Sequence, residues 1–464
     1  MRAARRLQAL QPTDIGVAGP SSLDMARAFR SVRAAPLSFL EEVSERFGDL
    51  VAFPVPGPPA LLVNDPADAR HVLQTSARHW GKQTVQYAAL GRVTGPGLLA
   101  SSEPSWIEHR RIAAPAFHHQ RLEAVGDQVR AAADAAITAR LAGESLGSGA
   151  VVDVAELTHR IGLDAVGRAL FSADLSGQAR QLLDATSEAA GLVVRLGRSI
   201  VPTVEWAPTP TNLRLRTTRR RLDAICTQIV AERRRRRGVA PAGSHGDDLL
   251  DLLLDSAMTD AEIRHELVTM VIAGHETVAA GLSWTLMLLA EHQPAQDLVR
   301  AELAGHAGPV SLLGHRETLP WTRAVVDEAL RLYPPAWVLS RRALRADVLG
   351  GREVPVGTLA IVSPWLLHRR SDSWPDPLVF QPDRFLEPDA ARSGYLPFGQ
   401  GPRLCIGREF ALGEMVVVLG RLLSEFRLAT PPDWSRPAAQ AQVAVHPRGG
   451  MPLVVTRAAG LQRG

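Results

Sequence analysis

The chain has 464 residues, of which 46% are hydrophobic and 5% aromatic, and its 52 basic side chains nearly balance 48 acidic ones. This apolar fraction is ample for a large core, so disorder, collagen and coiled coil are excluded as descriptions of the whole chain. A net charge of only +4 gives nucleic-acid binding no support. Cys226 and Cys405 are the two cysteines, far apart and without a visible secretory leader. The sequence therefore predicts reduced thiols and a cytoplasmic location.

The N-terminal segment, residues 1–40, contains neither a signal peptide nor a membrane anchor, because residues 7–20 include no continuous apolar run. Short apolar runs at 50–53 and 61–63, bounded by Gly and Pro, predict two strands of a hairpin. Residues 104–291 then follow a helical pattern. A stripe at i, i+3, i+4, i+7 and i+8 predicts an amphipathic helix over 219–237 with a packed cysteine. Its members are Leu222, Ile225, Cys226, Ile229 and Val230.

The five arginines at 233–237 end that helix, and we expect them to lie in water near the negative helix terminus, with an acidic partner as the alternative. Residues 267–290 are apolar enough to raise the question of a membrane span. They contain His275 and Glu276 near the centre, which favours a long helix inside a protein, because a mid-bilayer acid costs roughly 2.5 kcal/mol or more. Strands are predicted again at 347–362, and the absence of repeats favours one helix-rich domain over 1–464. Residues 50–65 and 347–365 would form its small β region.

Residues 398–407 combine glycines, an arginine and a cysteine in one short loop. The glycines on both sides of Cys405 permit tight turns against a flat, bulky group, and Arg403 places positive charge two residues from the sulfur. Helix amides just downstream would further favour a thiolate. The spacing of Phe398, Arg403, Cys405 and Gly407 resembles the heme-ligand loop of the cytochrome P-450 family, in which a cysteine thiolate binds the iron.

A second segment, residues 273–277, lies mid-way along the long apolar helix and looks like the family's oxygen-binding motif. Small residues at Ala273 and Gly274 leave room for a ligand, and Thr277 lies one turn from Ala273 on the same face. The resemblance implies that Thr277 and Glu276 deliver protons to dioxygen. The alternative is structural: Thr277 bonds to a backbone carbonyl and an arginine satisfies Glu276.

Further motifs resemble the family's structural and propionate-binding positions. Glu328 and Arg331, with Arg384 downstream, resemble a buried cluster that fixes the fold rather than performing chemistry. Trp106 and Arg110, one turn apart, would point together at a heme propionate.

The resemblance implies a further propionate contact in the segment before Asp347. Arg342 matches it by its distance from Asp347, with Arg341 as the neighbouring alternative, and Arg403 would be a further partner.

The resemblance covers nearly the whole chain and implies a mainly α fold with a minor β part, in which one large helix-rich body encloses a buried heme. It also implies a monooxygenase that uses heme b (iron protoporphyrin IX), dioxygen and two electrons to insert one oxygen atom into a hydrophobic small molecule of secondary metabolism. A terpenoid, a fatty acid and a polyketide all suit the apolar lining. Because no flavin or iron–sulfur segment is visible, ferredoxin and ferredoxin reductase are the expected electron donors to a monomeric enzyme.

The substrate pocket is expected to be lined by residues 83–97, by the central helix at Val271, Ala273 and Ala280, and by residues 336–338. Two other functions remain open. One is a peroxygenase, in which peroxide replaces electrons and dioxygen; the other is a non-catalytic heme binder or gas sensor. An assay with peroxide alone and a screen for substrate-induced spin shifts distinguish them.

Overall fold

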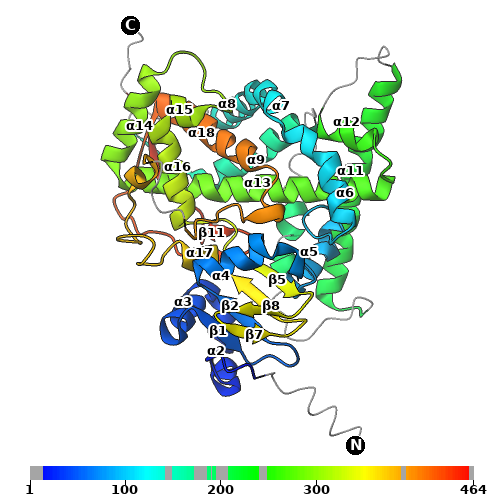
Figure 1. The fold of residues 1–464 in the computed structure, drawn as a ribbon. Helices are drawn as coiled ribbons and strands as arrows, with labels where there is room; N and C mark the ends of the chain where they lie inside the picture. The colour runs from blue at the N-terminus through cyan, green and yellow to red at the C-terminus, as the bar shows by residue number, and fades with distance from the viewer. Residues whose placement is uncertain are drawn as a thin grey trace, which may run out of the picture. The chain divides into compact units, whose positions relative to one another are not determined.

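The computed structural model describes residues 14–141, 149–171, 185–189, 191–194, 207–239, 248–387 and 393–458. Helices predominate and the strands form small sheets, as the sequence predicts (Figure 1). The fold separates into two compact units. The first comprises Met1–Ala88, Ala336–Val379 and Asp389–Cys405, and the second comprises Ala89–Pro335, Phe380–Pro388 and Ile406–Gly464. The single domain over 1–464 stays a prediction.

The first unit is built on a five-stranded sheet with strand order β1-β2-β8-β5-β3. Its strands are β1 (Leu50–Phe53), β2 (Ala60–Val63), β3 (Trp80–Gly81), β5 (Leu339–Ala343) and β8 (Leu359–Val362). The predicted hairpin is confirmed, since β1 and β2 pair antiparallel with Leu50 opposite Val63. Strand β2 also pairs with β8 in parallel, and all four of its residues are buried.

Short helices and a second hairpin complete the first unit. They are α2 (Ser22–Ala34), α3 (Pro36–Phe47), α4 (Pro66–Arg70), the π-helical turn His71–Thr75, α17 (Pro364–Leu367), β6 (Asp347–Leu349) and β7 (Arg352–Val354). Helices α2 and α3 lie beside the hairpin of β1 and β2 (Figure 1). The core of this unit gathers Leu61, Val63, Val72, Trp80 and Val362.

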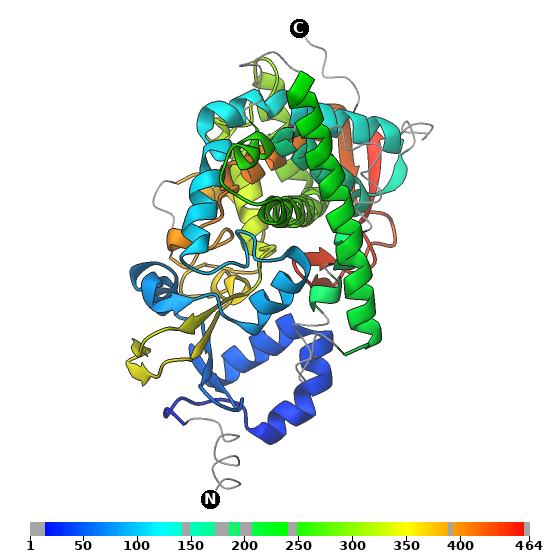
Figure 2. The ribbon, with the colours of Figure 1, turned by 90° about the vertical axis from the view of Figure 1, so that its right-hand side faces the viewer.

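The second unit is mostly helical, and its central element is α13 (Asp260–Glu291), which is seen end-on in Figure 2. The other helices are α5 (Val85–Thr94, which begins in the first unit), α6 (Ser105–Ala113), α7 (His119–Ala124), α8 (Gly126–Leu141), α9 (Val154–Phe171), α11 (Pro210–Val239), α12 (Leu249–Leu254), α14 (Gln293–Gly305), α15 (His315–Thr318), α16 (Pro320–Leu332) and α18 (Arg408–Glu425). Its strands are β4 (Ala150–Asp153), β9 (Phe426–Ala429), β10 (Ala439–Ala441), β11 (Val445–Pro447) and β12 (Pro452–Arg457). Helices α9, α16 and α18 all pack on α13.

Helix α13 begins with a capping box, in which Thr259 and Glu262 satisfy each other's backbone amides. Its apolar character is explained by burial on nearly all sides, as the sequence predicts. Toward its C-terminal end, the indole of Trp284 donates to the Val445 carbonyl at 2.8 Å and stacks on Tyr333 with ring centroids 4.0 Å apart. Among the residues that the structure describes, no helix is long and apolar enough to cross a membrane.

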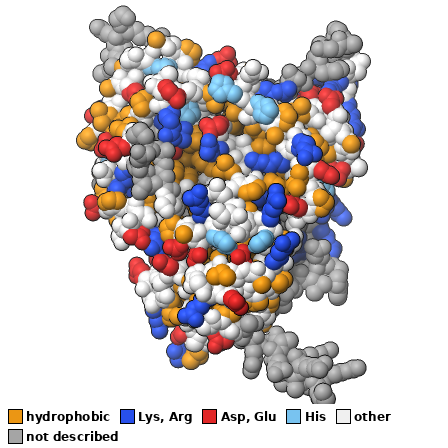
Figure 3. Space-filling view, in the orientation of Figure 1, with side chains coloured by type: hydrophobic (Ala, Val, Ile, Leu, Met, Phe, Trp, Pro, Cys, Tyr) orange, Lys and Arg blue, Asp and Glu red, His pale blue; other side chains and the backbone are white. Residues whose placement is uncertain are grey.

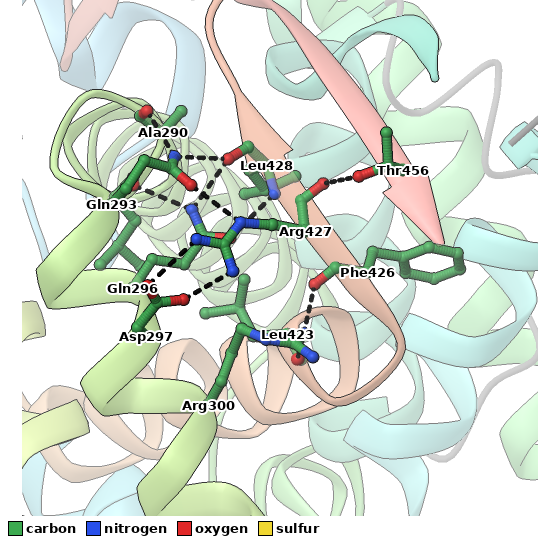
Figure 4. A network of polar contacts seen from close by, with 11 residues as sticks. Ala290, Gln293, Gln296, Asp297, Arg300, Leu423, Phe426, Arg427, Leu428 and Thr456 are labelled. Atoms are coloured by element: carbon green, nitrogen blue, oxygen red, sulfur yellow. Dashed lines mark hydrogen bonds and ion pairs between the residues drawn. The ribbon is translucent and has the colours of Figure 1, made fainter. Parts of the chain in front are cut away.

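The end of α13 and the start of α14 are bonded to strand β9 by side-chain amides (Figure 4). Gln293 and Gln296 both donate to the carbonyl of Leu428, at 2.8 and 2.9 Å, and Gln296 accepts from the Leu428 amide at 2.9 Å. Arg427 of the same strand pairs with Asp297 at 2.6 Å. This network anchors the C-terminal end of α13 to the sheet of β4, β12 and β9.

Helix α11 shows the predicted stripe, and Cys226 is buried in it with the pKa of its thiol raised to about 12 by burial. Three of the five arginines, Arg234–Arg236, are more than half exposed, as expected, whereas Arg233 differs from the expectation. Arg233 is mostly buried and pairs with Asp248 at 2.7 Å and Asp251 at 2.8 Å, so acidic residues of this chain, rather than water or another protein, neutralise it. Residues 240–247, which follow the arginine run, lie outside the described residues. In the face that Figure 3 shows, basic and acidic side chains are interspersed.

Candidate active site

The cysteine loop of the first unit is closed by its own backbone. The amide of Cys405 donates to the Phe398 carbonyl at 3.0 Å, and the Leu404 amide donates to the Gly401 carbonyl at 3.0 Å. Gly399 and Gly401 both have φ near +72°, which favours glycine. A Cβ at Gly401 would lie 2.1 Å from the carbonyl oxygen of residue 73, so this glycine also permits close packing on the π-helical turn. Cys405 is not part of a disulfide, and it is exposed.

The two neighbouring arginines of β5 differ in their surroundings. Arg342 is partly exposed and its guanidinium donates to two backbone carbonyls, those of Gln83 at 2.6 Å and Gly357 at 2.9 Å. Arg341 is only 5% exposed, and its bonds go to neutral oxygens, the Ser340 carbonyl at 2.9 Å and the Tyr87 hydroxyl at 3.5 Å. A buried guanidinium with neutral partners is suited to receive an anion.

A second buried cation lies near Arg341, and sequence reasoning missed it. Lys82 is 7% exposed, and its ammonium nitrogen is 4.4 Å from the centroid of the Tyr87 ring. Tyr87 therefore contacts both cations. The sequence gives no signal for Lys82, because a single lysine after a short strand is usually a solvated residue.

In the second unit, α6 brings Trp106 and Arg110 to one face. Trp106 is buried, and the guanidinium of Arg110 lies 5.9 Å from its ring centroid, as expected for residues one turn apart. The same helix is fixed to α13 by a buried pair, in which Nδ1 of His109 is 2.7 Å from Glu266. The hydrogen bond to Glu266 raises the pKa of His109, which strengthens this link.

Helix α13 is buried from residue 266 to residue 290 except at three positions. These are Ala273, Gly274 and Thr277, which the sequence analysis singled out. They lie at i, i+1 and i+4, so the partly exposed surface is confined to one short patch of the helix. Between residues 266 and 290, α13 is therefore accessible only at this patch.

Gly274 differs from the expectation that it leaves room for a ligand. A Cβ at Gly274 would lie 2.8 Å from the Val166 side chain of α9, and a Cβ at Gly162 of α9 would lie 3.1 Å from the His275 carbonyl oxygen. These glycines let α9 and α13 approach closely. Residue 274 therefore serves helix packing.

Glu276 and Thr277 have unlike environments. The hydroxyl of Thr277 donates to the Ala273 carbonyl at 2.8 Å, which is the structural alternative considered above. Glu276 is 5% exposed, its Oε2 atom has no partner among the described residues, and burial raises the pKa of its carboxyl to about 8. No arginine among those residues pairs with it. Glu276 is therefore protonated at neutral pH and can donate a proton.

The predicted structural cluster is present in the second unit. Glu328 and Arg331 are both fully buried and form a bidentate pair, with nitrogen–oxygen distances of 2.6 and 2.8 Å. Arg384 approaches the same carboxylate to 3.4 Å, and the Gln381 amide donates to it at 2.9 Å. Two nitrogens of Arg331 and the Gln381 amide therefore donate to one buried carboxylate, and the ion pair with Arg384 joins α16 to the segment around residue 382.

Comparisons with known proteins agree with these motifs. The family description "Cytochrome P450" matches residues 25–454. Pentalenene oxygenase of Streptomyces avermitilis is 31% identical over 94% of this chain and 97% of its own length, and human cytochrome P450 4F2 is 32% identical over 86% and 81%. The crystal structure of CYP175A1 from Thermus thermophilus has 30% sequence identity and a TM-score of 0.76, and covers 95% of this chain and 100% of the other.

The chain belongs to the cytochrome P450 family. It is therefore a monooxygenase that requires a heme iron, dioxygen and a redox partner. The residues described above fit such a group: an exposed thiol in a closed glycine loop offers a thiolate ligand, and buried cations suit the two carboxylates of a porphyrin. The sequence analysis singled out the thiol and the residues of the patch on α13, and it did not single out Lys82.

Proposed function

We propose that this protein is a heme b monooxygenase that hydroxylates a terpenoid. The observation that carries the monooxygenase assignment is the partly exposed patch of α13 at Ala273 and Thr277; of residues 266–290, the only other position that is not buried is Gly274, which packs on α9. Two bacterial relatives support the substrate class. One is pentalenene oxygenase, and the other is the cyclooctat-9-en-7-ol 5-monooxygenase of Streptomyces melanosporofaciens, which is 30% identical over 91% of both chains.

Cys405 is the proposed iron ligand, held as a thiolate. Backbone bonds from its own loop fix its position, and its exposure leaves the sulfur accessible. Phe398, Arg403 and Gly407 of the same loop would contact the heme. When bound, the heme supplies the oxidising power that inserts one oxygen atom into an unactivated C–H bond.

The propionates of the heme would be bound by buried or partly buried cations. We assign Arg341 to this role in place of Arg342, because the guanidinium of Arg342 is already bonded to two carbonyls whereas Arg341 is buried. Trp106 and Arg110 supply an indole N–H and a second guanidinium from one face of α6. Lys82 is a further candidate, because it too is buried.

Proton supply is assigned to two neighbouring residues of α13. Glu276 holds a proton on its carboxyl at neutral pH, because burial raises its pKa to about 8. Thr277 lies in the patch, where its hydroxyl would exchange its bond to the Ala273 carbonyl for one to the reacting oxygen. Glu276 would then restore the proton that Thr277 gives up.

The remaining assignments concern the surroundings of the enzyme. We propose that ferredoxin, reduced by ferredoxin reductase, supplies the electrons, and that Arg403 and Arg408 belong to the docking face. Salt would slow this encounter by screening the charges. We also propose a cytoplasmic monomer that serves secondary metabolism, in keeping with two free cysteines.

The decisive experiment is the carbon-monoxide difference spectrum of the reduced protein. Wild type should show the red-shifted band of thiolate-ligated heme, and Cys405→Ala should lose it. Cys226→Ala is the matched control, because it removes the other cysteine, which is buried in α11. A normal band in Cys405→Ala would overturn the ligand assignment, and a peroxide-only turnover equal to that with ferredoxin would favour a peroxygenase.

A further inference from the structure

The segment that leads into the cysteine loop is bonded to a buried histidine of the first unit. The backbone amide of Leu396, nine residues before Cys405, donates to Nε2 of His368 at 2.8 Å. His368 is completely buried, and Leu396 is nearly so. Because a backbone amide only donates, Nε2 carries no hydrogen. The ring is therefore neutral, with its hydrogen on Nδ1.

Both partners of this bond are held firmly in place. The amide of His368 donates to the Pro364 carbonyl at 2.9 Å, which ends α17, and its ring lies 5.3 Å from that of Tyr395. The Tyr395 ring also makes an edge contact with the buried Trp374, with centroids 6.0 Å apart. Leu396 belongs to the apolar core of the first unit. Ring packing at residue 395 and a hydrogen bond at residue 396 therefore fix the segment that enters the loop.

Backbone hydrogen bonds continue from this anchor to the cysteine. The Leu396 carbonyl accepts from the Gly399 amide at 3.0 Å, and the Phe398 carbonyl accepts from the Cys405 amide at 3.0 Å. Gly399 has a φ of +72°, so the turn between these bonds is one that other residues rarely adopt. The peptide units of residues 396–399 thus set the position of Cys405, and His368 holds the first of them.

We propose that His368 is a positioning residue for the thiolate: by accepting from the Leu396 amide, it holds the loop in the geometry that presents the Cys405 sulfur to the heme iron. The inference rests on the proposed role of Cys405 and adds a residue that acts on it through the loop. A buried amide without an acceptor is costly, so a protein that lacks this ring nitrogen would displace the loop toward another acceptor or water. The sulfur would move with the loop and be lost as a ligand.

The test compares two replacements of nearly the same length. His368→Gln places a carbonyl oxygen near the position of Nε2, whereas His368→Met places a thioether there, which is a weak acceptor. In the carbon-monoxide difference spectrum of the reduced holoprotein, His368→Gln should retain the red-shifted thiolate band. His368→Met should lose most of it to a band at shorter wavelength. His368→Asn, whose side chain is one bond shorter, should lose it too, and it replaces His368→Met if that variant does not accumulate.

Hydrogen exchange of the peptide that spans residues 393–405 gives a second readout, which does not depend on heme absorption. In the holoprotein, exchange of this peptide should be about tenfold faster in His368→Met than in wild type, the effect of leaving one buried amide without its acceptor. In His368→Gln it should equal that of wild type, because the acceptor is restored.

A matched control removes a hydrogen bond elsewhere in the same unit. Thr358→Val deletes a fully buried hydroxyl that donates to the Pro355 carbonyl at 2.7 Å, and it should change neither the band nor the exchange. The proposal is overturned if His368→Met keeps the wild-type band and exchange rate, if His368→Gln loses the band equally, or if Thr358→Val loses it as well. Failure of the proposed function would appear separately, as a wild-type protein without the thiolate band.

Discussion

Acidification is expected to destabilise the protein through His275, a residue beside the proposed proton donor. Its side chain is fully buried, and its Nδ1 atom donates to the Val271 carbonyl at 2.7 Å. The ring lies 6.0 Å from that of His159, which stacks on His446 with centroids 5.3 Å apart. Burial is the main cause that lowers the pKa of His275 to about 4, and it lowers that of His446 to about 3.

The size of the effect follows from proton linkage. The unfolded chain protonates His275 near its ordinary pKa of 6.5, whereas the folded protein does so only near 4. Between these pH values the unfolded state binds the additional proton, so the free energy of unfolding decreases as the pH falls. From pH 7 to pH 5 this residue alone removes about 2 kcal/mol.

The assay is urea unfolding of wild type and His275→Gln at pH 7 and pH 5, followed by circular dichroism. Glutamine retains an amide donor for the Val271 carbonyl and does not titrate. The difference in unfolding free energy between the two proteins should therefore change by about 2 kcal/mol between the two pH values. His292→Gln is the matched control, because His292 donates to the Leu288 carbonyl in the same way at the partly exposed end of α13. If the free energy of unfolding falls equally in wild type and His275→Gln between pH 7 and pH 5, the reasoning is refuted.

Three other predictions concern the site. The carboxyl of Glu276 has a pKa of about 8 in the folded protein, above its ordinary 4.5. Its contribution to folding stability is therefore lost as the pH rises through 8. Glu276→Gln should equal wild type in melting temperature near pH 4 and exceed it at pH 9. Glu328→Gln leaves the buried Arg331 without its charge partner and should lower the free energy of unfolding by about 3 to 5 kcal/mol. The variant should then lose heme during purification, and heme retention equal to that of wild type would contradict this prediction. Gly401→Ala should destabilise more than Gly351→Ala in thermal melting, because both have φ near +71° but only Gly401 faces a backbone atom.

Local patterns were sufficient to predict much of the fold. The hairpin of β1 and β2, the stripe that buries Cys226 and the long α13 all depend on periodicity and turn residues within one segment. The cysteine loop was predictable for the same reason, because its glycines and its sulfur lie within ten residues. Residues close together in the sequence determine each of these features.

Features that depend on distant segments were not predictable. Arg233 is neutralised by Asp248 and Asp251, which lie beyond the end of its own helix in the sequence. The space beside Gly274 is filled by Val166, more than a hundred residues earlier. In each case tertiary contacts decide the role, and residue type alone does not.

The choice between Arg341 and Arg342 shows why one residue matters in a strand. Successive side chains of β5 point to opposite faces, so an assignment displaced by one residue exchanges a buried guanidinium for a partly exposed one. Counting back from Asp347 selects Arg342, but a count across a turn cannot fix the register of the strand. Pairing with β8 fixes it, with Arg341 opposite Ala360, and leaves Arg341 buried. A propionate contact at this position is therefore better tested by replacing Arg341, with Arg342 as its control, than by the reverse.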